Sequence, residues 1–298
     1  MNEVSIQWFP GHMTRTKRQM QKLLPLVEGV IELLDARVPL SSRNPDIKEL
    51  IQNKPEIILL NKADTADPVM TDKWINELRK TASDVIPVDC RSGHGLDRIV
   101  PAIRKMLAPL IEKYEQKGMS GRTLHLMVVG IPNVGKSSFI NKMAGQSKAK
   151  VEDRPGVTRE KQWVRISDTI EFLDTPGVLW PKFEDMVVGE KLAFTGAVKD
   201  DVVDTELLAS RLLLTLRDIS PDSLTSHYKI DLATPEEDDA MEQGLTLGCA
   251  SGYELLCRVG KARNMLIKGG EINTERAALC LLDEFRGGKL GRITLDRL

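Results

Sequence analysis

The sequence predicts an α/β protein, a mostly parallel sheet flanked by helices, followed by a smaller α-helical domain. Three observations support this. Short apolar runs alternate with helical patterns up to about residue 173, a glycine-rich segment follows one of those runs, and little strand character remains after residue 180. Because 298 residues are enough for two domains, we expect the α/β domain over residues 1–180 and the helical domain over residues 181–298.

Short apolar segments mark the expected strands, and longer periodic segments mark the expected helices. The strands are expected at 27–34, 56–60, 84–88, 124–129, 162–166 and 169–173. The helices are expected at 14–24, from residue 45, and at 68–81, 96–107, 138–143, 207–216, 235–243, 252–266 and 273–286. Residues 108–122 are interpreted as a helix end and a Gly/Ser connection.

The composition fits an ordinary globular protein, with 41% hydrophobic and 29% charged residues. The net charge of -1 gives no argument for nucleic-acid binding by the chain as a whole. The four cysteines lack the spacing of a zinc site or a disulfide framework, so reduced thiols are expected. No apolar run reaches the roughly 18–20 residues of a membrane span, and no signal-peptide pattern opens the chain. A cytoplasmic location without membrane contact is therefore expected.

The segment 130–138, GIPNVGKSS, carries the phosphate-binding pattern G-x-x-x-x-G-K-S between an expected strand and an expected helix. Its glycines let backbone N–H groups turn toward phosphates, and the helix N-terminus favours an anion. Lys136 would reach the β- and γ-phosphates, and the Ser137 hydroxyl would bind Mg²⁺. The residues expected to contact the nucleotide here are Asn133, Val134, Gly135, Lys136, Ser137 and Ser138.

A second phosphate-linked motif, DTPG at 174–177, follows the last expected strand. Asp174 can hold Mg²⁺ through water, and the Gly177 N–H can meet a γ-phosphate that hydrolysis removes. Thr158, in the loop between the two motifs, is placed to give a second Mg²⁺ ligand. D-x-x-G alone is a weak signal, but it gains weight by following a strand downstream of Ser137.

The motif NKAD at 61–64 directly follows an expected strand and indicates guanine as the base. The Asp64 carboxylate can accept from guanine N1–H and N2–H₂, a donor pair that adenine lacks. Asn61 can bond the base edge and tie the loop down, Lys62 can pack on the ring, and Ala63 completes the loop. Ser92 and Gly93 follow the next strand, where a backbone N–H could donate to guanine O6.

The order of these motifs is circularly permuted relative to the usual guanine-nucleotide switch domain, because the base-recognition segments precede the phosphate segments. Residues 108–122 would then bridge the usual termini, which is feasible because domain termini are often close together. All the loops must still meet at the carboxyl ends of the strands. The sequence therefore predicts a P-loop GTPase domain with permuted motif order.

The chain resembles the circularly permuted GTPases of the YlqF/RbgA family (ribosome biogenesis GTPase A) over essentially its whole length. The shared segments are QWFPGHM at 7–13, LDARVP at 34–39, NKAD, GIPNVGKSS, RPGVT at 154–158, DTPG and FRGGKLGRITLD at 285–296. The resemblance implies a GTPase that binds GTP and GDP with Mg²⁺. It also implies action in late maturation of the large ribosomal subunit, and a C-terminal helical domain that touches RNA.

The residue after DTPG is Val178, where Ras-like proteins place a glutamine that orients the attacking water. Valine cannot hydrogen-bond water, so slow intrinsic hydrolysis is expected, completed by another group when a partner docks. The resemblance suggests His12 for that role, and RNA binding or a turn cap are the alternatives for His12. Lys136 and Thr158 are the other expected catalytic residues, through their phosphate and Mg²⁺ contacts. Asn133 resembles the asparagine with which potassium-activated relatives hold K⁺.

Both ends of the chain are basic. Residues 1–24 carry a net charge of +3, and residues 258–298 carry nine basic and five acidic side chains, a net charge of +4. On charge alone, solvated helix faces are the favoured interpretation of these basic residues. The resemblance reverses that preference and implies contact with RNA phosphates. The expected partner is the large ribosomal subunit, bound by a monomer. Two alternatives remain: an RNA-binding scaffold whose nucleotide is structural, and a P-loop ATPase or kinase.

Overall fold

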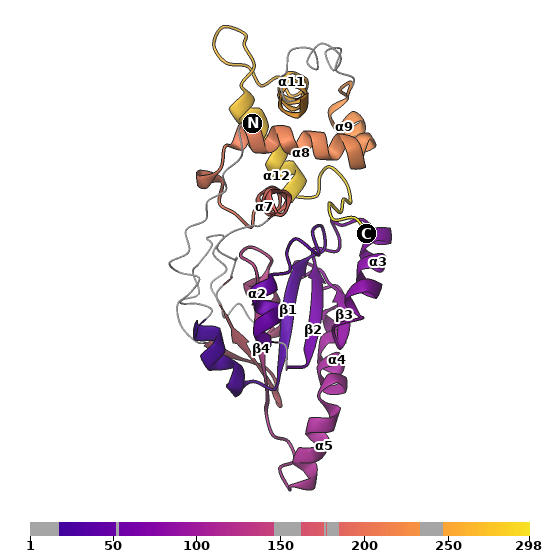
Figure 1. The fold of residues 1–298 in the computed structure, drawn as a ribbon, viewed down its shortest axis with the longest axis vertical. Coiled ribbons are helices and arrows are strands. Elements are labelled where there is room, and N and C mark those ends of the chain that lie inside the picture. Colours follow the sequence, from indigo (N-terminus) through magenta and orange to yellow (C-terminus); the bar gives the residue numbers. More distant parts are fainter. Residues whose placement is uncertain (1–17, 52–53, 146–161, 176, 178–184, 233–246) are drawn as a thin grey trace. The chain divides into compact units, whose positions relative to one another are not determined.

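The structure is a computed structural model that describes residues 18–51, 54–145, 162–175, 177, 185–232 and 247–298 (Figure 1). The described residues form two compact units. The sheet unit holds the described residues up to 177 together with Asp296–Leu298, and the helical unit holds those from 185 to 295. The expected boundary near residue 180 lies outside the described residues. The final three residues group with the sheet unit, although they were expected in the helical domain.

The sheet unit contains one six-stranded sheet in the order β3-β2-β1-β4-β6-β5. All strand pairs are parallel except β5 with β6, which is antiparallel. The six expected strands are confirmed with ends that shift by one or two residues. Their bounds are β1 Gly29–Asp35, β2 Glu56–Asn61, β3 Asp84–Pro87, β4 Leu124–Gly130, β5 Gln162–Ser167 and β6 Ile170–Asp174.

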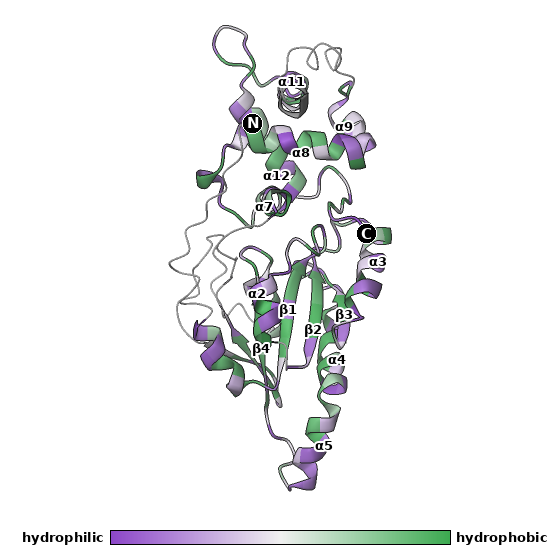
Figure 2. Ribbon diagram, in the orientation of Figure 1, coloured by the Kyte–Doolittle hydropathy of each residue, from purple (hydrophilic) through white to green (hydrophobic). Residues whose placement is uncertain are grey.

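The central strands are buried along their whole length, which explains their nearly continuous apolar sequence. Every residue of β1 and of β2 is buried. A strand in a parallel sheet has covered faces on both sides, so it selects Val, Ile and Leu without alternation. Figure 2 shows these two strands as strongly hydrophobic parts of the ribbon.

The helices of the sheet unit follow the strands in sequence. They are α2 Pro45–Ile51, α3 Pro68–Leu78, the short 3₁₀ helix η2 Leu96–Arg98, α4 Ile99–Met106, α5 Ala108–Gln116 and α6 Lys136–Met143. Residues 18–23 are also helical, inside the expected 14–24. The sequence assigned only a helix end to the start of 108–122, and the structure shows a separate helix, α5, with no buried residue.

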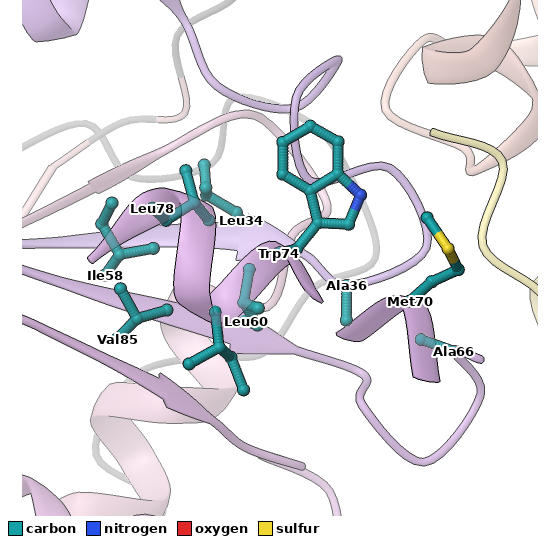
Figure 3. Packing of buried hydrophobic residues seen from close by; sticks show 10 residues of the cluster. Leu34, Ala36, Ile58, Leu60, Ala66, Met70, Trp74, Leu78 and Val85 are labelled. Carbon is teal, nitrogen blue, oxygen red and sulfur yellow. The ribbon is translucent and has the colours of Figure 1, made fainter. Parts of the chain in front are cut away.

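Helix α3 begins and packs as its sequence dictates. Asp67 caps it by accepting from the N–H groups of Val69 and Met70, and Pro68 occupies the first turn, where no backbone donor is needed. Trp74 lies in a buried cluster with residues of β1, β2 and β3 (Figure 3). The members drawn and labelled there include Leu34, Ile58, Leu60, Met70, Leu78 and Val85.

The helical unit is built around α8, Thr205–Ile219, which contacts α7 Met186–Phe194, α9 Pro221–Tyr228, α11 Leu247–Ala262 and α12 Thr274–Arg286. The expected segment 207–216 lies inside α8, and most of its leucines are buried in the core of the unit. Gly252 permits the close approach of α11 to α8, because a Cβ there would lie 2.7 Å from the carbonyl oxygen of Ser210. The expected helix at 235–243 lies outside the described residues.

Two helices of this unit were not expected. Helix α7 is apolar on most sides and contains Gly189, so it shows no clear helical period. Helix α9 has eight residues, too short for a periodic pattern to stand out. The expected segments 252–266 and 273–286 correspond to α11 and α12, although α11 starts and ends earlier than expected.

A buried carboxylate on α12 binds residues of α9 and Arg263, the residue that follows α11. Glu284 accepts from the Tyr228 hydroxyl at 2.6 Å and from the guanidinium of Arg263 at 2.8 Å, and its other contact is the His227 ring. Burial raises the pKa of Glu284, but these partners outweigh burial and hold the pKa below its ordinary value. The carboxylate therefore stays ionised and links α12 to α9 and to the segment that follows α11.

The end of the chain is fixed to the sheet unit by Asp296. Its carboxylate accepts from the Ser41 N–H and hydroxyl, both at 2.8 Å, and its carbonyl accepts from the Trp74 indole at 3.1 Å. Asp296 is only 2% exposed. These contacts join residues more than 200 positions apart in the sequence. No local sequence pattern predicts such contacts.

Candidate functional site

The parallel strands bring the separate motifs to one edge of the sheet. Asp35 at the end of β1 pairs in register with Asn61 at the end of β2, and Leu33 pairs with Gly130 at the end of β4. Asp174 closes β6 beside β4. In an open α/β sheet, ligands bind beyond the carboxyl ends of the strands. The permuted motif order therefore still assembles a single site.

The loop between β4 and α6 has the backbone of a phosphate-binding loop. Asn133 and Gly135 have positive φ angles of 57° and 104°, and α6 starts at Lys136, which directs its N-terminus toward the loop. The Lys136 ammonium donates to the carbonyls of Gly130 and Ile131 at 3.1 and 2.9 Å. Burial lowers the pKa of Lys136 to about 8, opposed by the charge of Asp174. A desolvated cation of this kind interacts strongly with a phosphate.

Asn61 joins the base-recognition loop to the phosphate loop. Its Nδ2 donates to the Val134 carbonyl at 2.7 Å, and its Oδ1 accepts from the Cys90 N–H at 3.0 Å. Gly135 is necessary for this contact, since a Cβ on it would lie 2.3 Å from Nδ2 of Asn61. The predicted role of Asn61 in tying the loop down is consistent with these bonds.

The neighbouring residues present Asp64 to solvent. Lys62 adopts a positive φ of 61°, and the Ala63 N–H donates to the Val88 carbonyl at 3.2 Å. Asp64 is exposed beyond this turn, so its carboxylate is accessible to a base. The Lys62 ammonium donates to the Asn133 carbonyl at 3.2 Å, a link from base loop to phosphate loop that the sequence did not indicate.

The loop after β3 differs from what was expected. The N–H groups of Ser92 and Gly93 both donate to Asp89, to its carboxylate at 3.1 Å and its carbonyl at 2.8 Å. Neither N–H is available to guanine O6 in this conformation. Sequence reasoning missed Asp89, which shapes the turn, and Cys90, which binds Asn61; an Asp before a Ser-Gly turn was the available signal.

The switch side of the site holds residues that suit Mg²⁺. Asp174 is buried, its carboxylate oxygen Oδ1 has no hydrogen-bond partner among the described residues, and burial raises its pKa despite the nearby Lys136. An orphaned buried carboxylate oxygen fits a hydrated cation that carries the compensating charge, and the half-buried Ser137 follows Lys136, whose charge acts on Asp174. Within the described residues, no group of three or more His, Cys, Asp or Glu side chains is arranged to hold a metal ion.

Gly177, the last residue of DTPG, packs against the phosphate loop. A Cβ at Gly177 would lie 2.8 Å from the Pro132 Cα and 3.0 Å from the Lys136 ammonium. Its closeness to the P-loop fits the predicted contact with a γ-phosphate. Thr158 and His12 lie outside the described residues.

The fold and the site together define a P-loop GTPase domain of circularly permuted motif order. The family model described as "50S ribosome-binding GTPase" matches residues 125–234. Ribosome biogenesis GTPase A of Bacillus cereus is 41% identical over 98% of this chain and 93% of its own length. The chain belongs to the ribosome biogenesis GTPase A family, which confirms the predicted resemblance, the fold class and GTP hydrolysis as the activity.

Further relatives and solved structures match over nearly the whole chain. Mitochondrial ribosome-associated GTPase 1 of Mus musculus is 35% identical over 98% of this chain and 90% of its own. Among solved structures, a GNP-bound YlqF from T. maritima matches with a TM-score of 0.62 and 26% identity, covering 95% of this chain and 98% of that chain. A GDP-bound YlqF matches with a TM-score of 0.58 and 25% identity, covering 94% of this chain and 99% of that one.

Proposed function

We propose that this chain is a GTPase that acts as a switch in late assembly of the large (50S) ribosomal subunit, with rRNA and ribosomal proteins as partners. The observation that carries the nucleotide part is the junction of the two loops, where Asn61 and Lys62 bond the backbone at Val134 and Asn133. The ribosomal part is supported by the names of relatives that are 35% and 41% identical over nearly the whole chain.

The site residues have distinct proposed roles. Asp64 accepts the guanine donors, and the P-loop backbone with Lys136 holds the phosphates. Ser137, Asp174 and Thr158 would hold Mg²⁺, which neutralises charge on the phosphates and aligns them for attack by water. Asn133 would hold K⁺ beside the phosphates.

RNA contact is proposed for the helical unit. Of the nine basic side chains counted from residue 258 onward, several serve internal contacts: Arg263 binds Glu284, and Arg286 binds the Asp200 carboxylate at 2.7 Å. The basic side chains that are exposed and suited to phosphate contact include Lys261, Lys268, Arg276 and Lys289.

A cytoplasmic monomer without membrane contact is proposed. Within the part of the chain that the structure describes, no helix is long and apolar enough to cross a membrane. Light scattering of the purified protein tests the monomer, and a stable dimer at micromolar concentration would contradict it.

GTP turnover with and without purified large subunits tests the proposed function. We expect slow turnover alone and at least about tenfold stimulation by large subunits, weakening as salt rises because phosphate contacts are screened. Small subunits are the matched control and should not stimulate. Absence of turnover even with large subunits would favour the scaffold alternative. Equal competition by ATP would favour the ATPase alternative, and equal rates in NaCl and KCl would contradict the K⁺ role.

We further propose that His12 orients or deprotonates the attacking water when the particle docks, since Val178 offers no hydrogen bond. His12→Ala is expected to reduce particle-stimulated turnover by about 10²–10⁴-fold, the usual contribution of a general base, without weakening GTP binding. His125→Ala is the control, because His125 lies near the start of β4, at the opposite end of the strand from the P-loop. Unchanged stimulated turnover in His12→Ala would remove the catalytic role.

A further inference from the structure

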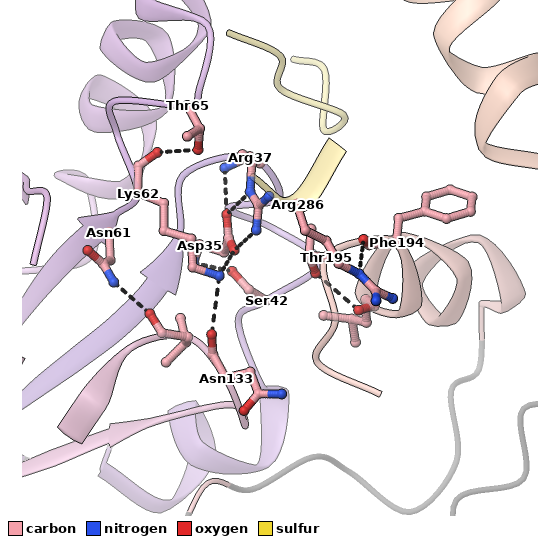
Figure 4. A network of polar contacts seen from close by, with 12 residues as sticks. Asp35, Arg37, Ser42, Asn61, Lys62, Thr65, Asn133, Phe194, Thr195 and Arg286 are labelled. Atoms are coloured by element: carbon pink, nitrogen blue, oxygen red, sulfur yellow. Dashed lines mark hydrogen bonds and ion pairs between the residues drawn. The ribbon is translucent and has the colours of Figure 1, made fainter. Parts of the chain in front are cut away.

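The segment after β1 places a buried ion pair beside the base-recognition loop (Figure 4). Asp35 and Arg37 are each only 1% exposed. The Arg37 guanidinium donates to both carboxylate oxygens of Asp35, from Nε at 2.9 Å and from Nη2 at 2.7 Å, and its backbone N–H also donates at 3.0 Å. This segment belongs to the LDARVP motif, which has no part in the nucleotide and metal contacts described above.

Lys62 connects this pair to the phosphate loop. Its ammonium donates to Oδ2 of Asp35 at 3.0 Å and to the Asn133 carbonyl at 3.2 Å, so one side chain spans three segments (Figure 4). Burial raises the pKa of Asp35, but the charges and hydrogen bonds of Arg37 and Lys62 outweigh it and hold the pKa far below its ordinary value. The carboxylate is therefore a permanent anion that fixes both cations.

The charge of Asp64, the carboxylate proposed to bind guanine, also acts on Arg37. Burial lowers the pKa of the Arg37 guanidinium, and the charges of Asp35 and, more weakly, Asp64 raise it above its ordinary value. Asp64 itself is exposed, so water screens this attraction, and the two hydrogen bonds of Lys62 carry the positioning.

We propose that Arg37 and Asp35 are positioning residues for guanine recognition: they fix Lys62 against the phosphate loop and so hold Asp64 at the place where it meets the base. The inference rests on the guanine site of the proposed function. The pair acts through Lys62 and the loop, without touching the nucleotide. Its loss should weaken the contact with the base more than the contact with the phosphates.

The 2-amino group of guanine gives a direct readout of this role. Inosine diphosphate keeps N1–H but lacks the amino group, so the ratio of GDP to IDP affinity reports the hydrogen bond from that group to Asp64. A general loss of stability lowers the binding of both nucleotides alike and leaves the ratio unchanged. A displaced Asp64 lowers the ratio.

The test uses the full chain carrying Arg37→Met or Arg37→Lys. Unlabelled GDP or IDP is titrated against a fluorescently labelled GDP, and its displacement gives the affinity of each nucleotide. Arg37→Met is expected to lower GDP affinity about tenfold or more and the GDP-to-IDP ratio about threefold or more, because a charge-assisted contact is lost. Arg37→Lys keeps the charge but not the two parallel bonds, so it should give intermediate values.

Arg43→Met is the matched control. Arg43 lies in the same segment and pairs with two other carboxylates, Glu32 at 3.1 Å and Glu56 at 3.0 Å. It should lower the melting temperature without changing the GDP-to-IDP ratio. An unchanged ratio in folded Arg37→Met, or an equal fall in Arg43→Met, overturns the proposal.

Two further measurements separate the possible failures. If Arg37→Met does not fold, as judged by circular dichroism, the ratio in Arg37→Lys decides, and a wild-type ratio there overturns the proposal. If the wild-type protein does not prefer GDP to ADP, the guanine site itself is refuted, whatever the Arg37 variants do.

Discussion

Asp64→Asn is expected to change the base preference of the site from guanine to xanthine. Guanine presents two donors, N1–H and N2–H₂, to the two oxygens of the carboxylate. Xanthine replaces the amino group with a carbonyl, so an Asn amide can accept from N1–H and donate to that carbonyl. Because a mismatched polar contact leaves a group unpaired, GDP affinity should fall about 100-fold or more and XDP should become the better ligand.

Competition titrations with GDP and XDP measure this change. Asp67→Asn is the control, because it makes the same substitution three residues away at the N-cap of α3, where asparagine caps as well as aspartate. The control should keep the preference for GDP. A site that still prefers GDP to XDP in Asp64→Asn would show that Asp64 does not read the base.

Gly135→Ala is expected to abolish tight nucleotide binding. The residue has a φ of 104°, which side chains rarely adopt, and a Cβ would lie 2.3 Å from Nδ2 of Asn61. Either the P-loop or Asn61 must move, and the bond from Asn61 to the Val134 carbonyl would be broken. Both the phosphate loop and the base loop then lose their positions, so GDP affinity should fall about 100-fold or more, the cost of two misplaced polar contacts.

Gly145→Ala separates strain from the clash. Gly145 also has a positive φ, 64°, but a Cβ there meets no atom of the described residues within 4 Å. It should cost about 1–2 kcal/mol of stability through backbone strain, with nucleotide affinity unchanged. Calorimetry and GDP titration of both variants check this. Gly135→Ala binding GDP within about threefold of wild type, a change below one hydrogen bond, would contradict the role of this contact.

Much of the sheet unit could be predicted from the sequence, because its strands and motifs are local patterns. Runs such as 56–60 are apolar throughout, as buried parallel strands must be, and a motif directly after each run lies at the carboxyl edge. Helices α7 and α9 were not predicted, because neither shows a clear local pattern. One lacks an amphipathic period, and the other is too short to show one.

Parts of the site depended on contacts that sequence spacing does not encode. Lys62 was expected to pack on the base ring, and the structure adds bonds from its ammonium to Asp35 and Asn133. Ser92 and Gly93 were expected to offer a free N–H, but Asp89 already accepts from both. A turn sequence specifies which residues bend the chain, and the surrounding atoms decide where each donor points.

The sequence by itself determined the chemistry of this protein. A carboxylate at Asp64, a lysine and serine after a glycine-rich loop, and an aspartate at Asp174 predict binding of guanine, phosphate and Mg²⁺ through their functional groups, in whatever order they occur. The tertiary structure decided which buried groups hold them in place, Arg37 on Asp35 near the site and Asp296 on Ser41 at the chain end. Such pairings follow from where the folded backbone brings distant segments together, so only the fold reveals them.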